Sequence, residues 1–93
     1  MRWKLFATLS ETVGDNVLEI TVDAEEPTLR DAVDALLSAH PELESQVLDD
    51  DDTLQDHLRV LCDGEDPFHS AAGWETDLSD VDELAMFPPV TGG

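Results

Sequence analysis

Positive charge is scarce in this sequence of 93 residues. Four lysines and arginines stand against 23 aspartates and glutamates, which gives a formal net charge of −19 at pH 7. Such a chain repels phosphate backbones and anionic lipids, so we expect no nucleic acid and no membrane among its partners. The acidity has two interpretations, solvation in a salt-rich cytoplasm or docking to a basic partner. The spread of acidic residues along the whole chain favours the first.

Sulfur ligands and long apolar runs are also lacking. The lone cysteine, Cys62, permits no internal disulfide and indicates a reducing compartment. No long apolar run opens the chain, so we expect no signal peptide or membrane span and predict a cytoplasmic location. The histidines His40, His57 and His69 show no zinc spacing, and the acidic run 49–52 lacks the glycine and glutamate of a calcium loop. We predict no metal site and no bound cofactor.

No pattern of an enzyme site is present. Cys62 follows His57 by five residues, but no third group is evident that would orient such a pair. A glycine-rich phosphate loop is absent as well. We predict that the chain is not an enzyme and has no catalytic residue.

The first third of the chain predicts two strands. Residues 2–8 alternate in a way that turns Trp3 and Leu5 inward, and residues 17–23 form a second alternating run. Turn chemistry at residues 14–16 lies between them. We therefore expect a hairpin.

A helix is predicted from Leu29 to about His40. Thr28 and Asp31 fit a capping box at its start, and Pro41 prevents its continuation. A short second helix is expected to begin at that proline. The main helix has one apolar stripe, made of Leu29, Ala32, Val33, Leu36 and Leu37.

The second half of the chain predicts further strands. Residues 58–62 form a strand that a tight turn at 63–64 closes, and residues 65–69 suggest a brief fourth strand. Residues 83–87 form the last strand, which the following prolines stop. The order predicts an α+β fold, a mixed sheet of four to five strands with one main helix packed across one face.

The sequence ends in "FPPVTGG". Its two prolines favour an extended conformation, and the six residues from Pro88 to Gly93 could span about 20 Å. Without side chains, Gly92 and Gly93 could pass through a narrow tunnel. The only functional group at the tip is the Gly93 carboxylate, which becomes reactive once ATP converts it to an acyl-adenylate. We expect residues 88–93 to be an exposed, flexible tail on a single domain that spans residues 1–93.

The stretch "DELAMFPPVTGG" resembles the C-terminal signature of the small archaeal modifier proteins and of the small subunit of molybdopterin synthase. The stretches "WKLFA", "AHPELES" and "DHLRVLCDGE" resemble the haloarchaeal modifier proteins in particular. The resemblance implies a β-grasp, ubiquitin-like fold. It also implies that an activating enzyme adenylates Gly93 with ATP, and that Gly92 gives access to its active site.

Two fates of the activated glycine are implied, and the residues do not separate them. The acyl group either becomes a thiocarboxylate for sulfur transfer, in molybdopterin synthesis or tRNA thiolation, or joins a lysine of another protein. The implied partners are a ubiquitin-activating-type adenylating enzyme and either the molybdopterin synthase large subunit or target-protein lysines. We expect the free chain to be a monomer. The alternative is a noncovalent acidic binding module with a passive tail.

A docking surface is predicted at the root of the tail. A β-grasp sheet pairs its first and last strands, which would bring Phe6 and Phe87 together on the helix-free face, opposite Trp3 and Leu5. An exposed aromatic patch there would mark an interaction site, whereas the alternative is that both rings belong to the core. The predicted partner-binding residues are Phe6, Phe68, Phe87, Pro88, Pro89, Val90 and Thr91.

Overall fold

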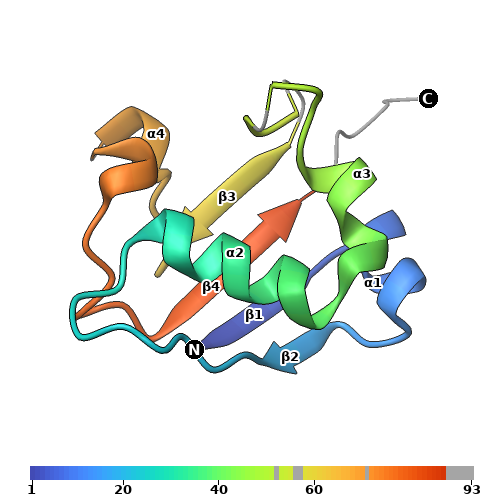
Figure 1. Ribbon diagram of the computed structural model, residues 1–93, viewed down its shortest axis with the longest axis horizontal. Coiled ribbons are helices and arrows are strands. Elements are labelled where there is room, and N and C mark those ends of the chain that lie inside the picture. The colour runs from blue at the N-terminus through green and yellow to red at the C-terminus, as the bar shows by residue number, and fades with distance from the viewer. Residues whose placement is uncertain (52, 56–57, 71, 88–93) are drawn as a thin grey trace.

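The computed structural model describes residues 1–51, 53–55, 58–70 and 72–87 (Figure 1). Four strands form one mixed sheet in the order β2-β1-β4-β3. β1 and β4 run parallel at its centre, while β2 and β3 flank them in antiparallel pairing. The strands are β1 (Arg2–Leu5), β2 (Val17–Glu19), β3 (Arg59–Cys62) and β4 (Glu83–Phe87).

Helix α2 (Leu29–Ala39) lies across one face of this sheet (Figure 1). Its start is the predicted capping box: the Thr28 hydroxyl accepts a hydrogen bond from the Asp31 N–H at 3.3 Å, and the Asp31 carboxylate accepts one from the Thr28 N–H at 3.0 Å. The helix ends at His40, where Pro41 opens a 3-10 turn, η1 (Pro41–Leu43), followed by α3 (Glu44–Val47). Both helix predictions are thereby confirmed.

Replacing Thr28 with alanine is expected to lower the free energy of unfolding by about 1 kcal/mol, because the Asp31 N–H loses its hydrogen-bond partner. For a domain of this size, that loss corresponds to a fall of about 4–8 °C in melting temperature. Thermal melts by circular dichroism measure it, with Thr28→Ser as the control that keeps the hydroxyl. Equal melting temperatures for the two variants would contradict the role of the cap.

The core lies between α2 and the inner face of the two central strands. Trp3 and Leu5 of β1 and Leu84 and Met86 of β4 are fully buried there, in line with the predicted alternation. From α2, the buried residues are Leu29, Ala32, Val33 and Leu36. The sheet face turned away from α2 is here called the outer face.

The connection between β1 and β2 differs from the prediction. The expected strand over residues 2–8 ends at Leu5, and helix α1 (Thr8–Val13) occupies the connection, while the predicted antiparallel pairing of the two strands is confirmed. Ala7 has a φ of 51°, which no strand accommodates, and the helix that follows buries Leu9 completely. Gly14, at a φ of 85°, ends the helix in the left-handed conformation. The strand prediction was wrong beyond Leu5 because burial of Leu9 outweighs local alternation.

The brief strand predicted over residues 65–69 was also wrong. A short helix, α4 (Pro67–Ser70), stands there, and a 3-10 turn, η2 (Gly73–Glu75), follows it. Proline is well suited to the first position of a helix, and the Asp66 carboxylate accepts a hydrogen bond from the Phe68 N–H at 2.9 Å. By contrast, the tight turn at residues 63–64 is confirmed, with both residues at positive φ. Across the described residues the sheet therefore has four strands.

Candidate functional site

The end of β4 is the place from which the predicted tail continues. Phe87 is the last residue of this central strand and the last that the structure describes. The predicted site residues Pro88, Pro89, Val90, Thr91, Gly92 and Gly93 lie outside the described residues. The structure therefore defines the surface at the base of the tail.

Two aromatic rings meet at this base. The rings of Phe6 and Phe87 stack with their centroids 4.4 Å apart and their planes at 18°. Phe6 and Phe87 directly follow Leu5 and Met86, the last pair of the parallel register, and the inward direction of Leu5 and Met86 places both rings on the outer face. Phe6 is 39% exposed and Phe87 is half-buried, so neither ring belongs to the buried core. We call Phe6 and Phe87 the aromatic pair; its role in binding a partner remains a prediction.

The surface around the aromatic pair differs in charge from the rest of the molecule. Three of the four basic residues of the chain, Arg2, Lys4 and Arg59, occupy outer-face positions of β1 and β3. Arg2 pairs with Glu19 at 3.2 Å, and Lys4 pairs with Glu83 at 3.4 Å. On a protein with a net charge of −19, this face is close to neutral, which lets a protein partner cover it without strong repulsion.

Phe68 lies elsewhere. It is 44% exposed on α4 and meets the edge of the Trp74 ring at a centroid distance of 5.5 Å. The Arg30 guanidinium stands 4.5 Å from the centre of the same indole. In Figure 1, α4 lies beyond the C-terminal end of β3, whereas β4 ends at the other end of the sheet. The structure thus does not bring Phe68 to the aromatic pair.

The sequence profile of the ThiS family matches residues 3–93, and so spans the sheet, α2 and the tail. The chain belongs to the ThiS family. None of its described helices has the length and apolar character needed to cross a membrane.

Individual relatives agree with this assignment. The chain is 48% identical over 93 residues to small archaeal modifier protein 1 of Haloferax volcanii, and the match covers all of both chains. The crystal structure of that protein superposes with a TM-score of 0.85, covering 100% of this chain and 98% of the other. The chain is also 31% identical in sequence to small archaeal modifier protein 1 from Methanosarcina acetivorans. The solution structure of that protein superposes with a TM-score of 0.81, covering 99% of this chain and 94% of the other.

These matches confirm the resemblance and the β-grasp fold predicted from the sequence. They also support the predicted class of function, a ubiquitin-like modifier and sulfur-carrier protein rather than an enzyme. The alternative of a noncovalent module with a passive tail is not favoured.

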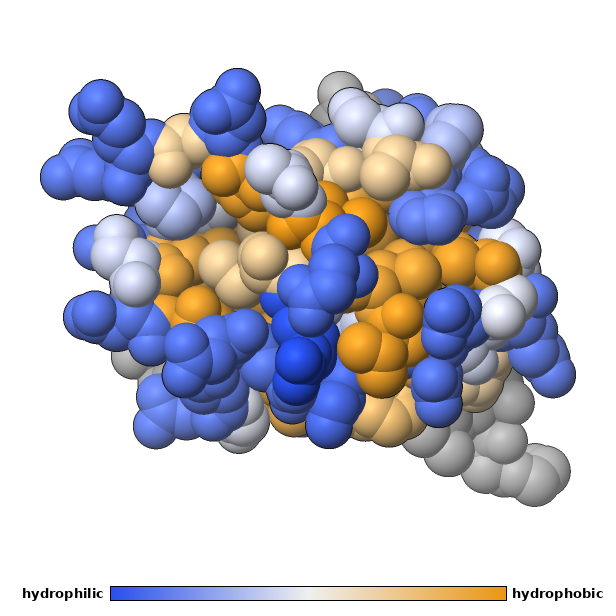
Figure 2. Space-filling model, turned by 90° about the horizontal axis from the view of Figure 1, so that it is seen from below, coloured by the Kyte–Doolittle hydropathy of each residue, from blue (hydrophilic) through white to orange (hydrophobic). Residues whose placement is uncertain are grey.

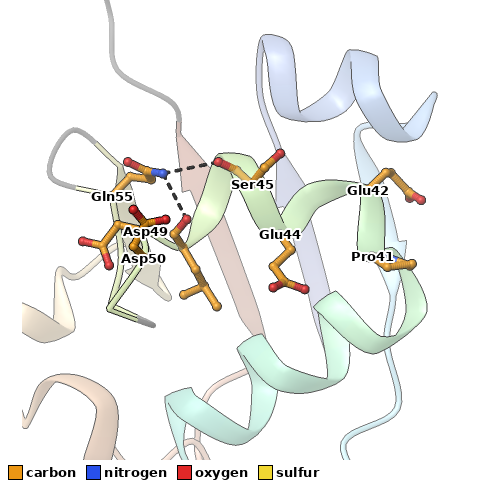
Figure 3. Close-up of a pocket in the computed structure, with 8 residues that line it drawn as sticks. Pro41, Glu42, Glu44, Ser45, Asp49, Asp50 and Gln55 are labelled. Carbon is orange, nitrogen blue, oxygen red and sulfur yellow. Dashed lines mark hydrogen bonds between the residues drawn. The ribbon is translucent and has the colours of Figure 1, made fainter.

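A hollow of about 680 Å³ is present on the surface of this ThiS-family protein (Figure 3). It lies beside η1 and α3, and the Gln55 amide crosses one side of it to donate to the backbone oxygens of Ser45 and Leu48, at 3.3 and 3.0 Å. The hydroxyl of Thr53 and the N–H of Asp51 hold the pKa of Asp49 below its usual value, so this carboxylate serves the turn of its own loop. The hollow is lined by Pro41, Glu42, Glu44, Ser45, Leu48, Asp49, Asp50 and Gln55.

This hollow has the character of a solvated acidic groove. Its four carboxylates are open to water, and among the described residues no group of three or more His, Cys, Asp and Glu is arranged to hold a metal ion. Within the described part of the chain, the buried side-chain polar atoms without a hydrogen-bond partner belong to Trp3 and Thr76, and neither residue lines the hollow. We assign it no function.

Cys62 is held in an unreactive state. Its side chain is buried at the end of β3, and this burial, with the carboxylates of Asp63 and Asp66 nearby, raises the pKa of the thiol to about 11. At neutral pH the sulfur is therefore protonated and a poor nucleophile. His57, the base considered with it, lies outside the described residues.

An apolar surface also borders β2, at the edge of the sheet. Figure 2 shows this side from below, with hydrophobic surface between strongly hydrophilic residues. Val17 is 39% exposed there, and Leu18, Val13 and Val22 are partly buried against the core. The strand is only three residues long and ends at Glu19, two features that discourage pairing with another strand.

Proposed function

We propose that this ThiS-family protein is a ubiquitin-like modifier and sulfur carrier whose Gly93 carboxyl group is activated with ATP by an adenylating enzyme. The observation that carries the proposal is the full-length match, at 48% identity, to a protein named as a small archaeal modifier. The parallel pairing of β1 and β4, which leads the chain out of the sheet at Phe87, supports it. The catalytic groups belong to the adenylating enzyme, and this chain is its substrate.

The proposed chemistry begins with a carboxylate that is inert by itself. An oxygen of Gly93 attacks the α-phosphorus of ATP, pyrophosphate leaves, and the acyl-adenylate that results has AMP as a good leaving group. A sulfur nucleophile then converts the glycine to a thiocarboxylate, which the molybdopterin synthase large subunit or a tRNA-thiolating enzyme consumes. An amine nucleophile, the lysine of a target protein, gives an isopeptide bond instead.

The aromatic pair is the proposed docking point for the adenylating enzyme. Exposed aromatic side chains at the centre of an interface commonly contribute most of its binding energy. Phe6 and Phe87 are preorganised by their stacking and lie at the root of the tail, so a partner that covers them receives Gly93 within the reach of six residues. The proposed location is the cytoplasm, where ATP and the adenylating enzyme are available.

Hydroxylamine trapping tests the proposal directly. The purified chain is incubated with the adenylating enzyme of its own cell, ATP and hydroxylamine, which converts an acyl-adenylate to a hydroxamate. Tandem mass spectrometry is expected to locate the hydroxamate on Gly93 and to find it only when ATP is present. A noncovalent module would give no hydroxamate, and a hydroxamate on a side-chain carboxylate would place the reaction elsewhere.

We further propose that the acidity adapts the chain to a salt-rich cytoplasm. Melting temperature is expected to rise with potassium chloride, most steeply up to about 1 M, where the Debye length falls to about 3 Å and self-repulsion is screened. The double variant Asp50→Asn, Asp51→Asn, which removes two exposed charges, should show a smaller rise. A melting temperature that stays flat or falls as salt increases would contradict the proposal.

A further inference from the structure

The chain contains a single lysine. Among the 93 residues only Lys4 has an ε-amine, the group to which a modifier of this class attaches its terminal glycine. If copies of this protein are joined to one another through side chains, Lys4 is where they are joined. The position of this residue therefore decides how such chains can form.

Lys4 is accessible in the folded protein. Its side chain is 43% exposed, and its ammonium group has one carboxylate contact, to Glu83 at 3.4 Å, among the described residues. Its cross-strand neighbours on the outer face are Val17 and Ala85, neither of which has a charged group that could pair with the amine. The other amine of the chain, at Met1, is less available because it is partly buried and donates to the Ile20 carbonyl at 3.0 Å.

Lys4 also lies next to the aromatic pair. Side chains two residues apart on a strand project from the same face, about 7 Å from each other. Lys4 precedes Phe6 by two residues, and its register partner Ala85 precedes Phe87 by two. A protein attached to the Lys4 amine would therefore start beside the two rings, and the folded body of that protein would follow within the roughly 20 Å reach of its six-residue tail.

We propose that Lys4 is the site at which a second copy of this protein is attached, and that this attachment prevents the modified copy from docking to the adenylating enzyme. The inference rests on the proposed function. In the joining step, the neutral Lys4 amine attacks the Gly93 carbonyl carbon of an adenylated copy. A C–N bond forms, the C–O bond to the phosphate breaks, AMP leaves with the bonding electrons, and the amine proton passes to water.

Attachment at this place has a directional consequence. A free copy that is modified at Lys4 cannot be activated at its own Gly93, so a free linked pair is a dead end. A copy already joined to a target through Gly93 no longer needs activation, and its Lys4 can still receive the next copy. Chains therefore grow on targets and not in solution.

The test has separate readouts for adenylation and for joining. Wild-type chain and Lys4→Arg, which keeps a positive charge near Glu83, are incubated with the adenylating enzyme and ATP. Digestion with cyanogen bromide, which cleaves after Met86, and with trypsin should yield peptide 3–30 bearing the branch 87–93 on Lys4. Lys4→Arg is expected to lower the amount of linked pair per adenylate formed by about tenfold or more.

The linked pair is then purified and offered to the enzyme again. Its adenylation is expected to be slower than that of the free chain by about tenfold or more. The control uses the double variant Lys4→Arg, Arg30→Lys, to which a second copy is joined by chemical coupling at the lysine introduced at position 30. This position lies on α2, on the opposite side of the sheet. This control pair should be adenylated at the rate of the free chain.

Two results would overturn the inference. One is an adenylated wild-type chain that forms no pair, or a pair that persists in Lys4→Arg. The other is a Lys4-linked pair that is adenylated as fast as the free chain. Failure of the proposed function differs from both, because no adenylate would then form with any variant.

Discussion

Removal of Gly92 and Gly93 is expected to abolish adenylation and to leave the fold intact. The proposed reacting group is the Gly93 carboxylate. Without the two glycines the terminal carboxylate belongs to Thr91, which has a branched side chain, and it stops two residues short of the active site. ATP–pyrophosphate exchange in the presence of the adenylating enzyme should fall to the level without the chain. The melting temperature should not change, because the core residues that the structure describes run from Trp3 to Met86 and Gly92 and Gly93 have no side chains to bury.

A matched extension variant separates loss of the carboxylate from loss of length. Two alanines added after Gly93 keep both glycines and move the terminal carboxylate away from them. Exchange should again fall to background. Adenylation of either variant at the wild-type rate would show that the enzyme does not act at Gly93, and an unfolded truncated protein would show that the tail is part of the core.

The double substitution Phe6→Ser, Phe87→Ser is expected to weaken binding of the adenylating enzyme about 30-fold or more, the effect of losing a hot spot of about 2 kcal/mol. The free energy of unfolding should fall by only about 1 kcal/mol, the value of one stacked aromatic pair beyond its area burial. Both rings lie outside the buried core, which is why the second effect is small. Titration calorimetry and urea denaturation, each in concentrated potassium chloride, measure the two quantities.

The chain supplies a control for this substitution in Phe68. That ring is slightly more exposed than Phe6 but stands against Trp74, away from the aromatic pair. Phe68→Ser should therefore leave the affinity unchanged if docking occurs at the base of the tail. Equal losses of affinity from both changes would mean that the docking surface extends to α4, and severe unfolding of the double variant would show that its rings are core.

Strong local signals in the sequence predicted most of the fold. The capping box at Thr28, the proline at position 41 and the Asp63-Gly64 turn depend on hydrogen bonds and backbone angles formed within a few residues, so they need no tertiary context. Period-two alternation likewise predicted the inner and outer faces of β1 and β4. Because these local preferences agree with the final packing, they predict the structure correctly without knowledge of the tertiary contacts.

Two elements escaped prediction for different reasons. α1 has only Leu9 as a buried residue, too few apolar positions to show a helical period in six residues. α4 had a readable signal, an aspartate directly followed by Pro67, which is a common start of a helix, but the apolar and charged residues around it also suggested a strand.

The part of the candidate site that was predicted correctly depends on the pairing of the first and last strands. Placing Phe6 beside Phe87 required the parallel pairing of the first and last strands, which came from the resemblance and not from local residues. The separation of Phe68 from this pair depends on how α4 packs beyond β3. The position of Lys4 on the outer face follows from the same pairing of β1 with β4. Lys4 is significant because it is the single lysine of the chain.

Mass spectrometry of the protein isolated from its own cells tests the central claim, the activation of Gly93, most directly. Trypsin alone is unsuitable, because the last basic residue is Arg59, so the chain is cleaved with cyanogen bromide after Met86. We predict C-terminal peptides 87–93 in which sulfur replaces one oxygen at Gly93, target lysines bearing this peptide as a branch, or both. Each should vanish in cells without the adenylating enzyme. Peptide 87–93 found only with an ordinary free carboxylate would contradict the account.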